Sequence, residues 1–444
     1  MNFKTQISRI MLCSIILFTL VTISVYAHCQ QKKVLIIGDT IPNFVLPKVI
    51  NGQVKKYTKR DFKNKLVIVD FWATSCGTCI EALPHLDSLQ QKYGQKLLIV
   101  PVTTEKSDYV KTFLANNRWT KNLSLPTVVE DNILTEFFPH EVVPHEIWIY
   151  NNKIVAITDS EYIDESNINK IIRGEQIDWP VKYDFYRYDS NKPLFVDDST
   201  YNSSIEKGLR YVMIGPYRTN LSLFGEEGIV RDSVKHTVRA YFINEPILNT
   251  YLKYWRRVSG LKKRTPTLGF QRNQIVWEVQ DSTRYYFEHG NGRGYSIDWM
   301  IANTICYESV SSDNGQSDIE IYKSLLEDLN RLLNLHVRWE RMNETVYVLR
   351  KRKANNNISR VNKIAGLKSY NISYLTFLLN QQANGKYFFN ESGDESTELM
   401  LNIDLLKDIN GLNNQLISQG YELSIEKRDI DKLIFTEITR KPQF

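Results

Sequence analysis

The feature that most constrains the fold is an apolar stretch that runs directly into two cysteines, Cys76 and Cys79. The β-branched run at residues 66–69 predicts a buried strand. A helical pattern follows the cysteines at once and continues to about Lys92, with apolar positions on one face at Ala82, Leu83, Leu86 and Leu89. We therefore expect Cys76 in the first turn of a helix, at the end of a central strand.

This position suits the two cysteines to redox chemistry. The free N–H groups and the dipole at a helix N-terminus favour the thiolate form of Cys76, which is the nucleophile in disulfide exchange. Cys79 lies one helical turn later, within reach to form or resolve a disulfide with Cys76. The pair is therefore predicted to be the catalytic centre.

Three further residues complete a family pattern. Trp72 precedes the cysteines, Pro84 falls five residues after Cys79, and Asp70 lies six residues before Cys76. A strand, a Trp, a Cys-x-x-Cys and a proline-kinked helix resemble the active site of the thioredoxin superfamily, in which a buried acid matches Asp70. By this resemblance Trp72 shields the cysteines and contributes to substrate binding. Two positions depart from the residues common in the family, Ser75 and Thr78. In the family, the pair of residues between the cysteines, which here includes Thr78, tunes the redox potential.

Residues 39–175 are predicted to form one α/β domain, with a central mixed sheet flanked by helices. Its expected elements are an opening stretch at 38–44 that leads into a hairpin-like segment ending at Gly52, strands at 96–102 and 125–129, helices at 107–116, 133–138 and 166–173, and a hairpin of 146–150 and 153–158. The opening stretch and the extra strand and helix at 125–138 resemble the TlpA/ResA-like branch of extracytoplasmic thiol-disulfide oxidoreductases. The resemblance implies a thioredoxin-like fold.

Val143 and Pro144 precede the predicted hairpin. In the family, a proline at this place is cis and packs beside the cysteines, so the resemblance assigns that role to Pro144. The backbone of Val143 would then pair with an extended substrate segment. The alternative is an ordinary proline at the start of a strand.

Two carboxylates are candidates for accepting the proton of Cys79, which must lose it to attack a mixed disulfide. Asp70 lies within an apolar strand, where an ionised group is costly, so its pKa should be raised. Glu105 follows the strand at 96–102, and a Glu occupies the matching place in the ResA-like branch. The alternative for Glu105 is a helix N-terminal residue favoured by the helix dipole.

Two other chemistries fit the sequence less well than thiol exchange does. A peroxiredoxin needs Thr or Ser three residues before its Cys and Pro seven before, where this chain has Ala73 and Val69. Copper delivery would use both cysteines with a distant histidine such as His140 or His145, but a Cys-x-x-Cys before a kinked helix fits redox chemistry better. We expect no metal and no cofactor.

Residues 1–27 are predicted to be a signal peptide, with Lys4 and Arg9 before an apolar run that ends at Ala27. A retained membrane anchor, or a lipoprotein cut before Cys29, is the alternative. Residues 28–38 would then be an N-terminal extension of an exported protein in the periplasm or cell envelope. Cleavage leaves four cysteines, too few for a disulfide-stapled scaffold. The net charge of +6 is mild, and together with export it excludes nucleic acid as an expected partner.

Residues 176–230 are predicted to be a linker, part of which packs on a domain. Residues 231–444 are predicted to form an α+β domain of repeated helix–strand–strand units, with turns near Asn343 and Asp429. Their order resembles an uncharacterised "soil-associated" family of exported proteins and, more distantly, small modules of secretins and TonB-dependent receptors. Residues 251–257 and 262–264 form a basic, aromatic cluster. We interpret it as a solvated helix face; the alternative is a surface that docks to an anionic membrane or polymer.

The sequence thus predicts an extracytoplasmic thiol-disulfide oxidoreductase that reduces protein or peptide disulfides. The resemblance implies that a membrane thiol carrier supplies the electrons. The alternative is an envelope binding or assembly module formed by residues 231–444, which could contact an envelope component. In that case the Cys-x-x-Cys domain is a redox sensor or an accessory.

Overall fold

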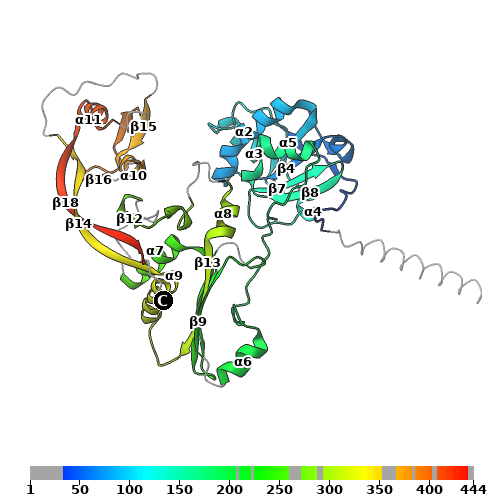
Figure 1. Ribbon diagram of the computed structural model, residues 1–444. Coiled ribbons are helices and arrows are strands. Elements are labelled where there is room, and N and C mark those ends of the chain that lie inside the picture. Colours follow the sequence, from blue (N-terminus) through cyan, green and yellow to red (C-terminus); the bar gives the residue numbers. More distant parts are fainter. Residues whose placement is uncertain are drawn as a thin grey trace, which may run out of the picture. The chain divides into compact units, whose positions relative to one another are not determined.

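The computed structural model describes residues 34–206, 210–221, 225–259, 272–287, 294–352, 367–382, 386–402 and 408–438 (Figure 1). The predicted signal peptide and Cys29 lie outside the described residues. The chain divides into two compact units. The first runs to Arg187 and also includes Gly294–Asp298, and the second comprises Tyr188–Arg293 and Trp299 onward.

The first unit is built on a six-stranded mixed sheet in the order β2-β6-β5-β4-β7-β8. Its central strand β4 runs parallel to β5 and antiparallel to β7. These strands and the small β1–β3 pair are β1 (Val45–Leu46), β2 (Val49–Ile50), β3 (Tyr57–Thr58), β4 (Leu66–Phe71), β5 (Leu97–Val102), β6 (Thr127–Val128), β7 (His145–Tyr150) and β8 (Lys153–Thr158). The β7–β8 hairpin turns at Asn151 and Asn152, both with positive φ, as predicted.

Helices flank this sheet, and alternate residues of β4 enter two different cores. Leu66 and Ile68 pack with apolar residues of α2, α3 and α5, whereas Val67 and Val69 pack with α4 and the opening stretch. The helices are α2 (Gly77–Tyr93), α3 (Ser107–Asn116), α4 (Leu134–Phe137) and α5 (Glu165–Ile172). The fold is thioredoxin-like, and the predicted mixed sheet flanked by helices is confirmed.

A segment from far along the chain completes the first unit. The ring of Tyr295 stacks on Tyr162 with 4.1 Å between centroids, and its hydroxyl donates to Asp164 Oδ2 at 2.5 Å. Asn167 Nδ2 donates to the same hydroxyl at 2.6 Å. Ser296 donates through both its N–H and its hydroxyl to Glu161 Oε2 at 2.6 Å. Residues 294–298 are therefore a structural part of the first unit.

Replacing Tyr295 should measure the contribution of this segment. Tyr295→Ala removes a half-buried aromatic ring and both hydroxyl contacts, so we expect the free energy of unfolding of the first unit to fall by about 2 kcal/mol. Tyr295→Phe keeps the stacking on Tyr162 and should cost about 1 kcal/mol. Urea unfolding of the full chain, followed by hydrogen exchange in residues 162–172, checks both values. Equal stability of all three proteins would show that the segment rests on the first unit without stabilising it.

The second unit repeats one order of elements, strand–helix–strand–strand–helix–strand. The first copy is β11 (Thr237–Pro246), α7 (Ile247–Ser259), β12 (Ile275–Glu278), β13 (Thr304–Ser312), α9 (Asp318–Leu333) and β14 (Leu335–Lys351). The second is β15 (Lys368–Asn371), α10 (Ile372–Gln382), β16 (Tyr387–Asn390), β17 (Glu398–Leu401), α11 (Ile409–Ile417) and β18 (Tyr421–Glu437). α8 (Ser296–Asn303) precedes β13, and only its part from Trp299 onward belongs to the second unit.

The two copies exchange the ends of their last strands. β14 and β18 pair antiparallel over their whole lengths, from Leu335↔Glu437 to Lys351↔Tyr421 (Figure 1). The end of β14 then pairs with β16 of the second copy, and the end of β18 pairs with β12 of the first. Leu433 and Phe435 accordingly enter the core formed with α7 and α9.

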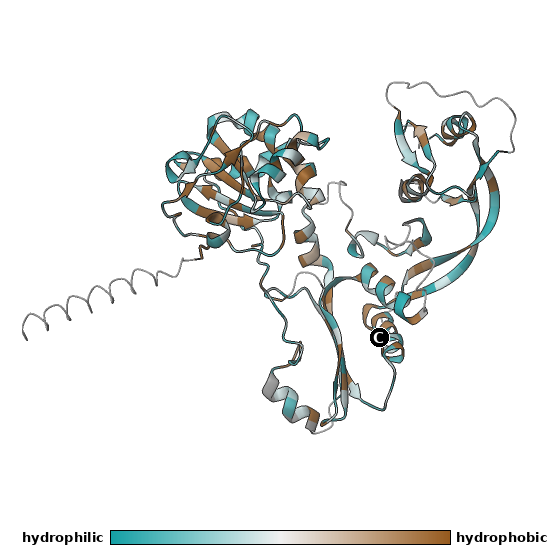
Figure 2. Ribbon diagram, turned by 180° about the vertical axis from the view of Figure 1, so that it is seen from behind, coloured by the Kyte–Doolittle hydropathy of each residue, from teal (hydrophilic) through white to brown (hydrophobic). Residues whose placement is uncertain are grey.

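The predicted turns near Asn343 and Asp429 are wrong, because β14 and β18 continue through both positions. The two residues lie opposite each other, and Asn343 Nδ2 donates to Asp429 Oδ1 at 2.9 Å. Most side chains in this middle part of the ribbon are exposed or half-buried, although Ile430 is buried, so polar residues occur on both sides. Figure 2 shows it largely in hydrophilic and intermediate colours. A two-sided polar strand has the composition of a turn.

The predicted linker at 176–230 is also corrected. Residues 176–187 pack in the first unit, while α6 (Asp198–Glu206), β9 (Tyr211–Pro216) and β10 (Glu227–Asp232) belong to the second. β9 and β10 are the edge strands of the sheet β10-β11-β13-β9. β10 has only two consecutive apolar residues after Gly228, which is why its pattern is weak, whereas β9 carries the apolar run Tyr211–Ile214 that the sequence analysis did not assign to a strand.

The basic, aromatic cluster in α7 is largely an internal feature of the second unit. Tyr251 and Tyr254 are buried, and the cations of Lys253 and Arg257 both pair with Glu227. The paired charges argue against a free basic surface on this helix. Residues 262–264 lie outside the described residues.

Candidate active site

The two cysteines are joined by a disulfide at the start of α2. Cys76 is the N-cap residue of the helix, and its Sγ accepts the backbone N–H of Cys79 at 3.2 Å. Cys76 is half-buried, while Cys79 is only 2% exposed. An incoming thiol or disulfide can therefore reach Cys76, whereas the buried Cys79 can react only with a disulfide that has already formed at Cys76.

Trp72 covers the pair from the end of β4. Its side chain is 2% exposed and belongs to the same core as Cys79. The indole Nε1 has no hydrogen-bond partner among the described residues. This buried position agrees with the predicted shielding role.

The loop before β7 lies against the disulfide. The Val143–Pro144 peptide bond is cis, as the resemblance implies, and the carbonyl oxygen of Val143 lies 3.8 Å from Cys76 Sγ. Both residues are half-buried. The backbone next to the reactive sulfur is therefore partly accessible to a substrate.

A buried ion pair from the segment after the sheet holds this loop. Asp184 Oδ2 accepts the backbone N–H groups of Glu141 and Val142, each at 2.9 Å. Lys182 Nζ donates to both carboxylate oxygens of Asp184, at 2.7 and 2.9 Å, and to the carbonyl of Val142 at 2.9 Å. The side chains of the pair are 4% and 1% exposed. Neither residue was predicted to have a role, because the segment has the polar composition of a linker.

Lys182 also helps to keep the imidazole ring of His145 neutral. Its ammonium lies 3.3 Å from His145 Nδ1, and because an ammonium has only donors, this ring nitrogen must be the acceptor. Burial, together with the charge of Lys182, lowers the pKa of His145 to about 3. His145 is thus a neutral ring stacked on His140, with 4.9 Å between centroids.

Asp70 has a partner that the sequence analysis did not assign. Glu146 on β7 is the register partner of Asp70 on β4, and the two side chains are 0% and 3% exposed. Burial raises the pKa of Asp70 to about 6, although a hydrogen bond from Glu146 opposes the shift. Burial and the neighbouring Asp70 raise the pKa of Glu146 well above its ordinary value. A charged residue directly before the apolar run Ile147–Tyr150 was the available signal.

Comparison with known proteins assigns this part of the chain to a family. The model of the redoxin family matches residues 36–133, which include the strand, both cysteines and the proline of α2. Residues 36–133 form a redoxin domain.

The redoxin domain has relatives of known name. The thioredoxin-like protein YneN of Bacillus subtilis is 33% identical over 96 residues, which cover 21% of this chain and 53% of YneN. The thiol-disulfide oxidoreductase ResA of Bacillus thuringiensis is 32% identical over 107 residues, covering 24% and 58%. The chain thus spans little more than half the length of the curated relatives it matches. The family model stops at residue 133, so the predicted resemblance of residues 231–444 to the soil-associated family stays a prediction.

Two solved structures are similar to the redoxin domain in fold. The thioredoxin domain of a thiol-disulfide oxidoreductase from Bacteroides vulgatus is 21% identical, with a TM-score of 0.26, and the match covers 32% of this chain and 99% of that domain. The exposed lipoprotein thioredoxin of Streptococcus pneumoniae is 20% identical, with a TM-score of 0.26, covering 30% and 99%.

Glu105 holds the turn before the cysteines of the redoxin domain. Its Oε1 accepts the hydroxyl of Thr74 at 2.7 Å, and its Oε2 accepts the backbone N–H of Thr74 at 2.9 Å and the hydroxyl of Thr103 at 3.3 Å. These contacts fix the chain two residues before Cys76. Both carboxylate oxygens of Glu105 are thus engaged in hydrogen bonds, whereas Asp70 is buried and has a raised pKa.

The described residues contain no group of three His, Cys, Asp or Glu side chains that could hold a metal ion. His145, one ligand considered for copper, has the Lys182 cation against its Nδ1. Within the part of the chain that the structure describes, no helix combines the length and the apolar character needed to cross a bilayer.

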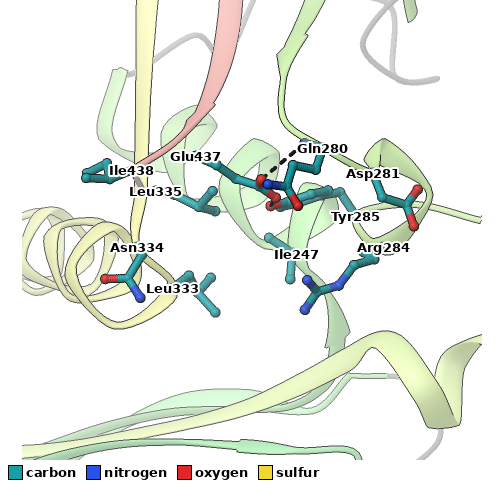
Figure 3. A pocket seen from close by; sticks show the side chains of 10 residues that line it. All are labelled: Ile247, Gln280, Asp281, Arg284, Tyr285, Leu333, Asn334, Leu335, Glu437 and Ile438. Atoms are coloured by element: carbon teal, nitrogen blue, oxygen red, sulfur yellow. Dashed lines mark hydrogen bonds between the residues drawn. The ribbon is translucent and has the colours of Figure 1, made fainter. Parts of the chain in front are cut away.

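The second unit contains a separate pocket of about 280 Å³ (Figure 3). Its central carboxylate, Glu437, accepts the backbone N–H of Gln280 at 3.1 Å and the hydroxyl of Tyr285 at 2.9 Å. The remaining lining comes from Ile247, Asp281, Arg284, Leu333, Asn334, Leu335 and Ile438. Because its polar centre is internally hydrogen-bonded, the pocket gives no sign of a particular ligand.

Proposed function

We propose that the protein is an extracytoplasmic thiol-disulfide oxidoreductase that reduces protein or peptide disulfides. The observation that carries the proposal is the half-buried Cys76 at the N-cap of α2, bonded to a buried Cys79 beside the Val143 carbonyl. An accessible attacking sulfur and an enclosed resolving sulfur are what two-step disulfide exchange requires. The ResA and YneN relatives support the same activity.

In the reductive direction, the Cys76 thiolate attacks one sulfur of the substrate disulfide. A mixed disulfide forms, and the other substrate sulfur leaves as a thiol after taking a proton. Cys79 then loses its proton to a carboxylate, with Asp70 the favoured acceptor and Glu105 positioning the turn before Cys76. The Cys79 thiolate attacks Cys76 Sγ, which releases the second substrate thiol and forms the Cys76–Cys79 disulfide. The substrate gains two electrons and two protons.

The binding roles follow from the same geometry. Trp72 excludes water from the sulfurs, and the backbone of Val143 before Pro144 holds an extended substrate segment. Return to the dithiol requires a dithiol donor, for which a membrane thiol carrier is the proposed class. Export through residues 1–27 would place the reaction in the periplasm or envelope, where the second unit would contact envelope components.

The test is the midpoint potential of the Cys76–Cys79 couple in the purified full chain. It is obtained by equilibration with glutathione or dithiothreitol buffers and counting of free thiols by alkylation and mass spectrometry. We expect a reversible two-electron couple near about −270 mV or lower, the range of a dedicated reductant. A value near about −120 mV would make the protein an oxidant, and the absence of a reversible couple would overturn the oxidoreductase proposal.

A further inference from the structure

Glu146 on β7 is a fully buried carboxyl that has no role in the exchange steps proposed for Cys76 and Cys79. Because Asp70 and Glu146 are register partners in an antiparallel pair, their Cβ atoms lie directly opposite each other on the same face of the sheet. Neither carboxyl oxygen of Glu146 meets an N–H, hydroxyl or cationic donor among the described residues. Across the strands Glu146 faces the carboxyl of Asp70 on β4 and the side chain of Thr158 on β8, whose hydroxyl oxygen accepts the indole N–H of Trp148.

Two neighbouring carboxyl groups that are both buried away from water cannot both be ionised. Like charges in a buried site repel strongly, and the usual solution is that the pair shares one proton. The raised pKa values of both groups agree with this arrangement. One neutral carboxyl then donates a hydrogen bond to its ionised partner.

The pair lies on the side of the sheet that carries Cys79. Ile68, two residues before Asp70, and Trp148, two residues after Glu146, both belong to the core that contains Cys79. Neighbouring residues on the other face, such as Phe71, enter the opposite core. The carboxyl pair is therefore beneath α2 and not beneath the opening stretch.

Other charged groups near the pair are few. Asp159, at the end of β8, is a third carboxyl, and burial raises its pKa to about 6. The Lys182 ammonium lowers the pKa of both Glu146 and Asp159 but is itself bonded to Asp184. On α2, the titratable group that faces the sheet is Cys79, which is free to ionise only when the disulfide is reduced.

We propose that Asp70 and Glu146 act as one proton-holding pair for Cys79, with the proton on Glu146 keeping Asp70 ionised as the acceptor. This proposal rests on the proposed function. In the resolving step the Cys79 thiol gives its proton to Asp70, so the pair then holds two protons. It returns one when the substrate thiol leaves, and the electron balance of disulfide exchange is unchanged.

The experiment is the pH dependence of the resolving step in Glu146→Leu and Glu146→Gln. A mixed disulfide between Cys76 and a chromophoric thiol is formed in the reduced full chain, and release of the chromophore is followed after rapid mixing. Gln keeps the shape of a neutral Glu and still donates to Asp70, whereas Leu removes the donor. Because a hydrogen bond to the ionised form lowers a pKa, we expect the acid limb of the rate profile to move to higher pH by about one unit in Glu146→Leu and to stay in place in Glu146→Gln. Asp70→Asn should slow release by about 100-fold or more.

Asp159→Asn is the matched control, because it removes a buried carboxyl of raised pKa that has no place in the pair. Its profile should coincide with that of the unaltered protein. If Glu146→Leu also coincides, Asp70 acts alone and the proton-pair inference fails while the proposed function stands. If the unaltered protein forms no mixed disulfide, the proposed function itself fails.

Infrared spectroscopy of the unaltered protein gives a test that needs no turnover. A neutral, buried carboxyl shows a carbonyl stretching band that shifts in D₂O, and one such band should persist at neutral pH in the reduced protein. The band should disappear in Glu146→Gln. Its absence from the unaltered protein at neutral pH would show that the pair holds no shared proton and would overturn the inference.

Discussion

Cys76→Ser should abolish disulfide exchange, with a loss on the order of 10³-fold or more, because the hydroxyl of serine is not ionised at neutral pH and cannot replace the attacking thiolate. The geometry makes the effect specific to this sulfur, since Cys76 is half-buried whereas Cys79 is enclosed. Turnover is measured as reduction of a fluorescent peptide disulfide by the full chain, with a dithiol as the electron source.

Cys79→Ser should behave differently. Cys76 can still attack, but no second sulfur resolves the product, so the substrate stays attached through a mixed disulfide. Mass spectrometry of the intact protein would detect this adduct, and Cys76→Ser should show none. Cys306→Ser is the matched control, because Cys306 is a free, buried cysteine of the second unit. Trapping through Cys76→Ser, or loss of turnover in Cys306→Ser, would contradict the assigned roles.

Asp184→Ala should cause the largest loss of stability in the first unit. It leaves the Lys182 ammonium buried without its partner and leaves the backbone N–H groups of Glu141 and Val142 without an acceptor. Breaking a buried ion pair from one side costs about 3–5 kcal/mol. The measurements are urea unfolding of the full chain and hydrogen exchange in residues 138–146. Faster exchange of the Glu141 and Val142 amides is the local sign of a released loop.

The control for Asp184→Ala is Lys92→Ala, which breaks an ion pair with Glu165 in the same unit. Both side chains of that pair are more than half exposed, so solvent screens the interaction and the loss of stability should be far smaller than that of Asp184→Ala. Equal effects of the two substitutions would show that the buried pair does not hold the loop.

The stability that Asp184 supplies should also depend on pH in a defined direction. Burial alone would raise the pKa of Asp184, but the hydrogen bonds from Lys182, Val142 and Glu141 hold it below its ordinary value. A carboxyl with a lowered pKa in the folded state stabilises the fold above its unfolded pKa and loses that contribution as pH falls through the folded one. The difference between the unaltered protein and Asp184→Ala should therefore shrink in acid.

The fold of the first unit could be predicted because its signals are local. The buried run at β4, the apolar face of α2 and the Asn151–Asn152 turn each depend on a few neighbouring residues. The second unit was harder. Its helices α9 and α10 follow from apolar spacing, but the middle of the continuous ribbon of β14 and β18 is mostly polar and so has the composition of two turns.

The residues of the candidate site also fall into two groups, those predicted from local sequence patterns and those that only the tertiary structure shows. The sequence alone predicted the reactive pair, the shielding Trp72 and the buried Asp70, because each has a short, fixed spacing from Cys76, and it predicted Pro144 from its place before the β7–β8 hairpin. Only the tertiary structure decided which groups face them. Glu146 meets Asp70 through strand register, and Lys182 reaches the Val142 carbonyl from 40 residues away. Register and long-range pairing depend on how separate elements pack, and a single sequence carries no local signal for either.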